Sequence, residues 1–250
     1  MDEIAVQLFS IRQAIDDALE ESLARLAGLG YRGVELAGLA GARPERWSDL
    51  LLRYHLVPVG MHVPYEALDD DAEGVAAEAS IIAAPVIVLP ALPESKRDSA
   101  AAWDNAADWM NRVGERVRKA GKRFAYHNHW FEFDAIGPGE TGYDRLLAKT
   151  DPALVEFELD LFWAARAGQS LPDLIARLGQ RMTLCHIKDM TGDNERTFAP
   201  VGHGTLPWAQ LFPLLNVESL IVEQDRCSDP DPFTCLQASI EFLQSKSQAL

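Results

Sequence analysis

Short apolar stretches alternate along the chain with longer stretches in which apolar residues recur every three or four positions. The short stretches are typical of buried strands, and the longer ones of amphipathic helices. In residues 14–30, for example, Leu19, Leu23 and Leu26 recur at helical spacing, and Gly30 follows as a stop signal. The pattern predicts strands at residues 4–10, 31–37, 57–64, 85–91, 122–129, 154–161, 181–189 and 217–225. It predicts helices at residues 14–30, 45–55, 69–83, 99–121, 142–150, 170–179, 206–215 and 231–246.

Strict alternation of strands and helices predicts a parallel sheet with right-handed crossovers. Eight such units in 250 residues are typical of a closed (β/α)₈ barrel. An open doubly wound sheet also alternates, but it usually carries a glycine-rich turn after its first strand. Here the first strand runs into "LFSIRQAID", which has no glycine. We therefore expect the α/β class and one TIM-barrel domain over residues 1–250.

Composition and charge narrow the function classes. The chain is 48% hydrophobic and 24% charged, which is ordinary for a globular protein. Its net charge of −15 disfavours duplex nucleic acid and anionic membrane surfaces as partners. The N-terminus does not resemble a secretory signal, and no segment is long and apolar enough to span a membrane. Three cysteines without CxxC spacing do not indicate a disulfide framework, so a cytoplasmic location is expected.

Polar residues gather where the predicted strands end, which is where α/β barrels place their active sites. Five of the six histidines lie at or just after strand ends. Carboxylates also fall within apolar runs such as "FELDLF" and "LIVEQD", where burial is costly without a compensating partner. A metal ion would compensate them, and a salt-bridge network to Lys188 and Arg226 is the alternative. The strand-end polar residues are Gln7, Glu35, His62, His127, His129, Glu132, Glu158, Asp160, His186, Lys188, Asp189, Glu223, Gln224 and Asp225.

A mixed set of oxygen and nitrogen ligands can be drawn from these positions: Glu132, Asp160, His186 and Glu223. Such a set suits one divalent ion, and Mn²⁺, Mg²⁺, Co²⁺ and Zn²⁺ all remain open. Two carboxylates beside a metal would provide bases on opposite sides of a bound substrate. That arrangement suits proton removal and return next to a carbonyl whose oxygen the metal polarises.

Five segments in order resemble the motifs of the xylose isomerase-like TIM barrel superfamily: "YHNHWFEF", "FELDLFWAARAG", "LCHIKDM", "PVGHGTLPW" and "LIVEQD". They are most similar to the sugar phosphate isomerase/epimerase group, which also includes inosose dehydratase-like proteins. The resemblance covers nearly the whole chain and is strongest from about residue 120 to 226. It implies a barrel enzyme with one divalent metal held by Glu, Asp, His and Glu from successive strands.

The resemblance matches Asp160, His186 and Glu223 to the last three ligands of the family. The sequence departs at the first ligand, because His127 stands where many members carry a glutamate. Glu132 could reach back from the following turn and would preserve the charge, so it is the preferred first ligand, with His127 as its rival. Glu132 and Glu223 are then also the predicted catalytic carboxylates, and His127 is otherwise a substrate-binding residue.

Further roles are implied for residues around the ligands. His129 is the predicted general acid or base, and His62 would bind a substrate hydroxyl. Lys188 would contact a hydroxyl or carbonyl, although an ion pair with Asp189 is the alternative. Trp163 would form an apolar wall for a sugar ring, unless it belongs to the core. His203 lies in a glycine-rich loop that could close over the site.

The resulting prediction is a metal-dependent isomerase or epimerase of a sugar, keto-sugar or cyclitol, acting by proton abstraction next to a metal-bound carbonyl. A dehydratase or lyase of a keto-sugar or inosose on the same site is the alternative, and a non-catalytic sugar-binding barrel is a third reading. Related barrels cleave abasic DNA with three metals, but six histidines and a charge of −15 disfavour that activity. The apolar helix "AAWDNAADWM" is compatible with a homo-oligomer. Whether the substrate is phosphorylated stays open.

Overall fold

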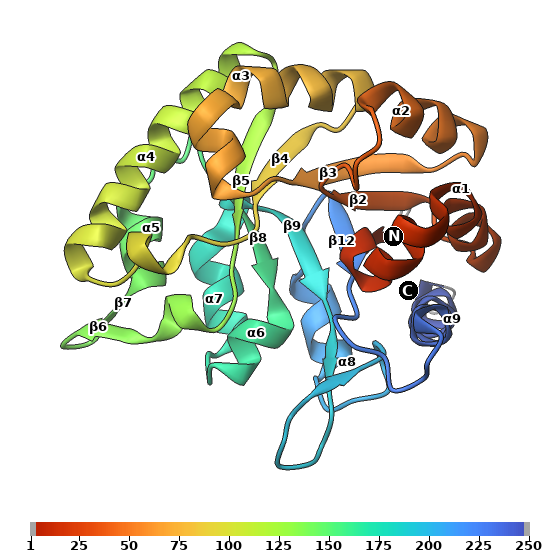
Figure 1. Ribbon diagram of the computed structural model, residues 1–250. Coiled ribbons are helices and arrows are strands. Elements are labelled where there is room, and N and C mark those ends of the chain that lie inside the picture. The colour runs from red at the N-terminus through yellow and green to blue at the C-terminus, as the bar shows by residue number, and fades with distance from the viewer. Residues whose placement is uncertain (1–3, 248–250) are drawn as a thin grey trace.

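The computed structural model describes residues 4–247, and in this range eight parallel strands close into a barrel (Figure 1). The barrel strands are β1 (Ile4–Gln7), β2 (Gly33–Ala37), β3 (Val57–His62), β4 (Val86–Leu89), β5 (Arg123–His127), β8 (Glu156–Asp160), β9 (Met182–Ile187) and β12 (Ser219–Val222). Each strand pairs with its neighbours along the chain, and β1 closes the ring against β12. The predicted α/β class and TIM-barrel architecture are confirmed.

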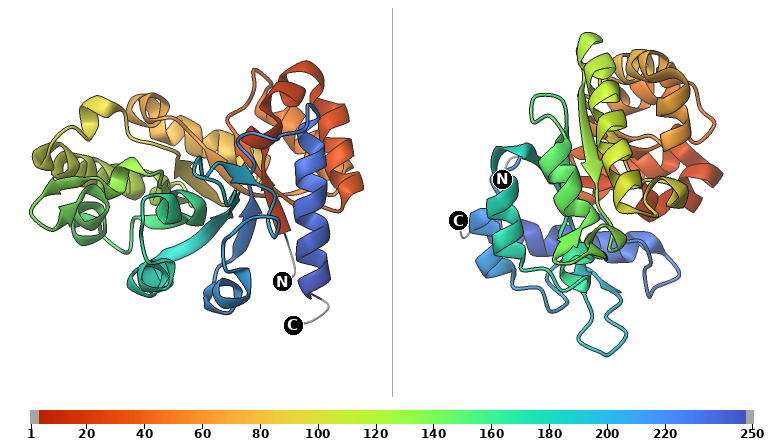
Figure 2. Two further views of the ribbon diagram at one scale, coloured as in Figure 1. Left: turned by 90° about the horizontal axis from the view of Figure 1, so that it is seen from below. Right: turned by 90° about the vertical axis from the view of Figure 1, so that its left-hand side faces the viewer.

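Helices cover the outside of the barrel (Figure 2). They are α1 (Arg12–Leu29), α2 (Pro44–Arg53), α3 (Tyr65–Ile82), α4 (Ala100–Lys119), α5 (Gly142–Lys149), α6 (Leu161–Arg166), α7 (Leu171–Leu178), α8 (Trp208–Leu211) and α9 (Pro232–Ser247). The last helix, α9, lies beside the first, α1, so both ends of the described chain meet at the β1–β12 closure (Figures 1 and 2).

The interior of the barrel has an apolar layer beneath a polar one. The apolar layer is a cluster of buried residues: Ala5, Val59, Val86, Val88, Ala125, Leu184 and Ile221. Side chains along a strand alternate between its two faces, so the residue two positions further on also faces inward. Those positions hold Gln7 on β1, His127 on β5, His186 on β9 and Glu223 just after β12. The strand period thus places polar side chains directly above the apolar layer.

Two of the strand pairings contain an irregularity. Between β2 and β3 the register shifts after Val34, so that Glu35 lies opposite Gly60 and Val59 is an extra residue. Between β8 and β9 it shifts after Phe157, and Thr183 is the extra residue. Such bulges are over-represented next to active sites because they re-aim side chains. A Cβ atom at Gly60 would lie 2.6 Å from Glu35 Oε1, so this glycine leaves room for that carboxylate.

The structure adds local elements that the hydrophobic pattern did not predict. The loop at residues 136–142 contains the short strands β6 (Ala135–Gly137) and β7 (Glu140–Thr141). After β9, β10 (Asp189–Met190) and β11 (Phe198–Ala199) form a hairpin that projects from the barrel in Figure 1. The predicted helix at residues 206–215 is shorter, because α8 passes into a 3₁₀ turn that contains Pro213.

Two expectations from the sequence are corrected. Cys227 and Cys235 form a disulfide, with Cα atoms 5.9 Å apart, because the β12–α9 loop turns back onto the first turn of α9. The expected absence of a disulfide was therefore wrong, and the cytoplasmic location loses that support. Trp103 and Trp109 of α4 are buried within the chain, so they do not form the exposed apolar face that suggested an oligomer. Among the described residues, no helix combines the length and apolar character of a membrane span.

Candidate active site

A cavity of about 400 Å³ opens at the carboxyl ends of the barrel strands. Its polar side comes from strand-end residues, and its apolar side from the loops that follow β1, β2, β3 and β4. The lining residues are Phe9, Ala37, Gly38, His62, Pro64, Pro90, His127, His129, Glu223 and Asp225. The location agrees with the general placement of active sites in this architecture.

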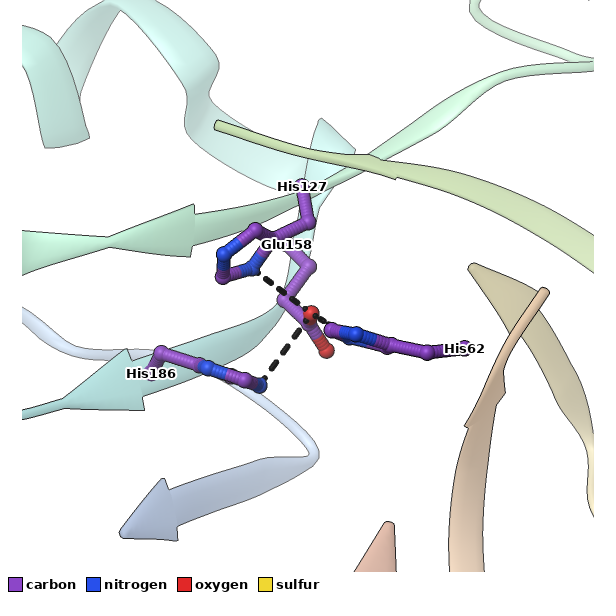
Figure 3. A group of neighbouring side chains, drawn as sticks. All are labelled: His62, His127, Glu158 and His186. Carbon is purple, nitrogen blue, oxygen red and sulfur yellow. Dashed lines mark hydrogen bonds and ion pairs between the residues drawn. The ribbon is translucent and has the colours of Figure 1, made fainter. Parts of the chain in front are cut away.

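Three imidazoles converge on one carboxylate at the bottom of the cavity (Figure 3). Oε2 of Glu158 lies 2.8 Å from His62 Nε2, 3.0 Å from His127 Nδ1 and 3.2 Å from His186 Nε2. These side chains come from β3, β5, β8 and β9, and we call them the deep group. Glu35 extends it, because its Oε2 lies 2.6 Å from His186 Nε2.

A second group shares two of these histidines and lies closer to the strand ends. His127, Asp160, His186 and Glu223 each offer a ligand atom, all within 4.8 Å of one another, and all four are buried. We call them the upper group. His186 links the two groups, because its Nδ1 lies 2.9 Å from Glu223 Oε2 while its Nε2 faces the deep group.

Lys188 neutralises part of the upper group. Its ammonium lies 2.8 Å from Asp160 Oδ2, 2.6 Å from Glu223 Oε2 and 3.0 Å from Asp225 Oδ2. Burial alone would lower the pKa of Lys188, but the three carboxylates raise it well above its ordinary value. The ammonium in turn contributes to the lowered pKa of Glu223, against the opposing effect of burial. Lys188 and Glu223 therefore both stay charged at neutral pH.

The donor chemistry fits a divalent ion. The upper group offers two imidazoles and two carboxylates, all buried and with ligand atoms within 4.8 Å of one another. Buried carboxylates are costly without compensation, and a cation would supply it. Imidazole and carboxylate ligands together suit Mn²⁺, Zn²⁺ or Co²⁺, whereas Mg²⁺ prefers oxygen ligands.

His129 lines the cavity, and its buried ring nitrogen Nδ1 has no hydrogen-bond partner among the described residues. Its ring stacks on Phe131 and lies 5.7 Å from Trp163, centroid to centroid. Burial, followed by the charge of Lys188, lowers the pKa of His129 to about 3. The imidazole is therefore neutral at pH 7.

Glu132 is held outside both groups. Its Oε1 accepts a hydrogen bond from the Tyr126 hydroxyl at 2.5 Å, and its Oε2 accepts one from the backbone N–H of His129 at 2.8 Å. The turn at residues 131–133 points this carboxylate away from the ligands. The structure thus differs from the prediction of Glu132 as first metal ligand, and it brings His127 to the other ligands instead.

The remaining predicted residues divide between the cavity and its surroundings. His62 lines the cavity, whereas Trp163 packs behind it against His129 and Trp130. His203 is exposed and outside the lining. Asp189, the alternative partner for Lys188, instead accepts hydrogen bonds from the loop at residues 202–208.

Sequence reasoning gave too little weight to Glu35 and Glu158. Both were among the strand-end polar residues but were assigned no role, and both contact the histidines of the deep group. The available signal was the strand period, because Glu158 precedes Asp160 by two positions and shares its inward face. The period gives no comparable signal for Glu35, whose partner strand is irregular.

Comparisons with known proteins agree with this fold. The family model described as xylose isomerase-like TIM barrel matches residues 23–246. An inosose dehydratase of Clostridium beijerinckii is 22% identical over 171 residues, which cover 58% of this chain and 55% of that relative. The chain thus spans about half the length of that relative.

Solved structures show the same fold. A sugar phosphate isomerase/epimerase from Parabacteroides distasonis superposes with a TM-score of 0.85 at 20% identity, over 96% of this chain and 97% of that one. The IolI protein, solved with a bound zinc atom, superposes with a TM-score of 0.74 at 13% identity, over 96% of each chain.

Proposed function

This chain belongs to the xylose isomerase-like TIM barrel family, and from that premise we propose that it is a divalent-metal-dependent enzyme acting on a sugar, keto-sugar or cyclitol. The reaction begins by removing a proton from a carbon next to a carbonyl. Loss of water from a keto-sugar or inosose is the favoured outcome, and isomerisation or epimerisation is the second candidate.

The observation that carries this proposal is the upper group, whose two imidazoles and two carboxylates lie within 4.8 Å of one another beside the cavity that His127 and Glu223 line. His129 lines the same cavity and is the proposed proton carrier. The positive charge of Lys188 lies behind the cavity lining and holds Asp160 and Glu223 in place as ligands for the ion. Enolisation requires an ion and a proton carrier at one cavity, and the upper group and His129 would supply them.

The ion would be held by His127, Asp160, His186 and Glu223. A divalent ion there supplies Lewis acidity, which polarises a carbonyl and acidifies the neighbouring C–H. His127 suits this role because burial and the positive potential of His186 lower its pKa well below the ordinary value. Its imidazole is therefore available as a neutral ligand.

Two features favour dehydration over epimerisation. His129 can take the proton and then deliver it to the departing hydroxyl, which leaves as water. Epimerisation needs a second proton carrier on the opposite face, and Glu223, which would serve, is instead a proposed ligand of the ion and is paired with Lys188. The inosose dehydratase relative supports the same choice.

The test is proton exchange with solvent deuterium on scyllo-inosose, followed by detection of the dehydrated product. Metal-loaded protein should exchange the proton, and His129→Asn should lower the rate about 10²-fold or more without loss of bound metal. A control is Phe131→Leu, which removes only the ring stacked on His129. If the protein binds scyllo-inosose but never exchanges its proton, it is a sugar-binding barrel rather than an enzyme.

The first metal ligand is tested separately by metal content after reconstitution with Mn²⁺ or Zn²⁺. His127→Ala should lower the bound metal about tenfold or more, since it removes a ligand. Glu132→Gln should retain the metal, because Glu132 contacts only Tyr126 and the backbone of His129. The reverse pattern would restore Glu132 as the ligand.

A further inference from the structure

The electrostatic character of the cavity bears on a question that the sequence leaves open, which is whether the substrate carries a phosphate. In α/β barrels a phosphate usually binds in the loops after the seventh and eighth strands, on backbone N–H groups or basic side chains. These two loops in this chain follow β9 and β12, at residues 188–207 and 223–231. Free donors or positive charge in either loop would allow it to bind a phosphate.

The loop after β9 uses its donors on the protein's own carboxylate. Asp189 is buried, and its Oδ1 accepts the backbone N–H groups of Met190 at 2.8 Å and Leu206 at 3.0 Å. Its Oδ2 accepts the N–H of Gly202 at 2.9 Å and the indole N–H of Trp208 at 2.6 Å. Asp189 thus takes the place that an external anion would need in this glycine-rich loop.

The loop after β12 is acidic. It carries Glu223, Asp225, Asp229 and Asp231 against one cation, Arg226, whose side chain is exposed. Glu223 and Asp225 line the cavity directly. A phosphate at this position would therefore face like charges.

No lysine or arginine lines the cavity within the part of the chain that the structure describes. Lys188 is enclosed by three carboxylates. Arg12 is outside the lining; its guanidinium lies 4.2 Å above the ring of Phe9, and one nitrogen donates to the backbone carbonyls of Phe9 and Asp225. The opposite wall is apolar and comes from Phe9, Ala37, Pro64 and Pro90.

Acidic side chains outnumber basic ones at the centre. The carboxylates that contact its histidines or lysine are Glu35, Glu158, Asp160, Glu223 and Asp225, whereas the basic side chains among them are His62, His127, His186 and Lys188.

From this arrangement we infer that the cavity takes an uncharged sugar, keto-sugar or cyclitol and rejects sugar phosphates. The inference rests on the proposed function and adds the substrate class. The hydroxyl groups of an uncharged ring can bind His62, Glu223 and Asp225, while its apolar face packs on the wall at Phe9. A phosphate would find no lysine or arginine in the lining that the structure describes, and the donors of the usual loop already bind Asp189.

The test compares matched ligands on Mn²⁺-loaded protein by isothermal titration calorimetry at low salt. We expect myo-inositol to bind, and myo-inositol 1-phosphate to bind about tenfold more weakly or not at all, because like charges repel. High salt should narrow the difference by screening. Metal content is measured afterwards to show that the phosphate has not removed the ion. Equal or tighter binding of the phosphate would overturn the inference, and so would failure of both ligands to bind at millimolar concentration.

A charge variant gives a second readout. Asp225→Asn removes one negative charge from the cavity wall and should shift the ratio of the two affinities towards the phosphate. Glu115→Gln makes the same charge change on the exposed surface of α4 and should leave the ratio unchanged. An unchanged ratio in Asp225→Asn would contradict the electrostatic argument.

Deuterium exchange with D-fructose and D-fructose 6-phosphate separates this inference from the proposed function. If D-fructose 6-phosphate exchanges its proton and D-fructose does not, the inference is wrong and the enolising activity stands. If uncharged ligands bind but no ketone tested is exchanged, the activity is wrong and the uncharged ligand class stands.

Discussion

At the scale of single residues, position along a strand predicted which side chains meet, but not how they pair. Asp160, His186 and Glu223 could be placed at one rim because each ends or directly follows an apolar strand. The direction of Glu132 could not, because it depends on a single 3₁₀ turn that leaves no periodic signal. Its partner Tyr126 reads in the sequence as an ordinary core aromatic residue.

The pKa of Glu132 gives a prediction at this scale. Burial, opposed in part by the hydrogen bond from Tyr126, raises its pKa from the ordinary 4.5 to about 7. The native state therefore binds this proton more tightly than the unfolded state. The stabilisation is complete below about pH 4.5 and is lost as the pH rises through about 7, amounting to roughly 3 kcal/mol.

Glu132→Gln mimics the protonated form and should remove this dependence. Its free energy of unfolding, measured with urea between pH 5 and pH 8, should increase relative to that of the wild type as the pH rises. The exposed Asp98→Asn variant should follow the wild type at every pH. A constant difference between Glu132→Gln and the wild type would show that Glu132 titrates near its ordinary pKa.

At the scale of elements, the hydrophobic pattern predicted the eight strands and most helices, because each buries a periodic apolar face. It did not predict the β10–β11 hairpin or the disulfide. These features depend on polar and sulfur contacts that join residues up to 19 positions apart, such as Asp189 and Trp208. Such contacts leave no repeat in the sequence. The sequence analysis placed His203 in a loop that could close over the site, whereas the structure has it exposed and outside the cavity lining. Contacts within that loop leave no repeat from which its position could be predicted.

The loop held by Asp189 supplies the prediction at this scale. Asp189→Ala would leave four donors without their acceptor, at a cost of about 3 kcal/mol or more in the free energy of unfolding. Hydrogen–deuterium exchange should rise across residues 200–208 and stay unchanged in β4 and β5. The exposed Asp98→Ala variant should change stability by about 0.5 kcal/mol or less. Unaltered exchange in the loop would mean that Asp189 does not anchor it.

At the scale of the whole molecule, the barrel brings four strands to one buried cluster with more acids than bases. Ligand side chains from β5, β8 and β9, and from the end of β12, converge there, so any ion bound to the upper group joins distant parts of the chain. An ion that binds only the folded state stabilises it by mass action. The metal is therefore expected to affect global unfolding rather than one loop.

Metal removal tests this expectation. With Mn²⁺ or Zn²⁺ at about 100 times its dissociation constant, the free energy of unfolding should rise by about 2.7 kcal/mol. For a chain of this length that raises the melting temperature by about 5–10 °C relative to protein treated with EDTA. Glu223→Gln should reduce the rise, and Glu115→Gln should not. Coincident melting curves with and without the ion would exclude a site in the folded barrel.

The extra residues in β3 and β9 have a consequence for how the site tolerates change in length. Val59 and Thr183 each displace by one position the alternation of inward and outward side chains in the residues that follow. His62 follows Val59, and His186 follows Thr183. Deleting either residue would restore regular pairing with the neighbouring strand, so the downstream histidine would still face the barrel interior. Deleting Met61 or Cys185, which lie between the extra residue and the histidine, would instead turn the histidine towards the helices, although no ligand is replaced. Single-codon deletions should thus be tolerated better at Val59 and Thr183 than at Met61 and Cys185. The direction of each side chain at the centre thus depends on the number of residues that precede it in its strand as well as on its own identity.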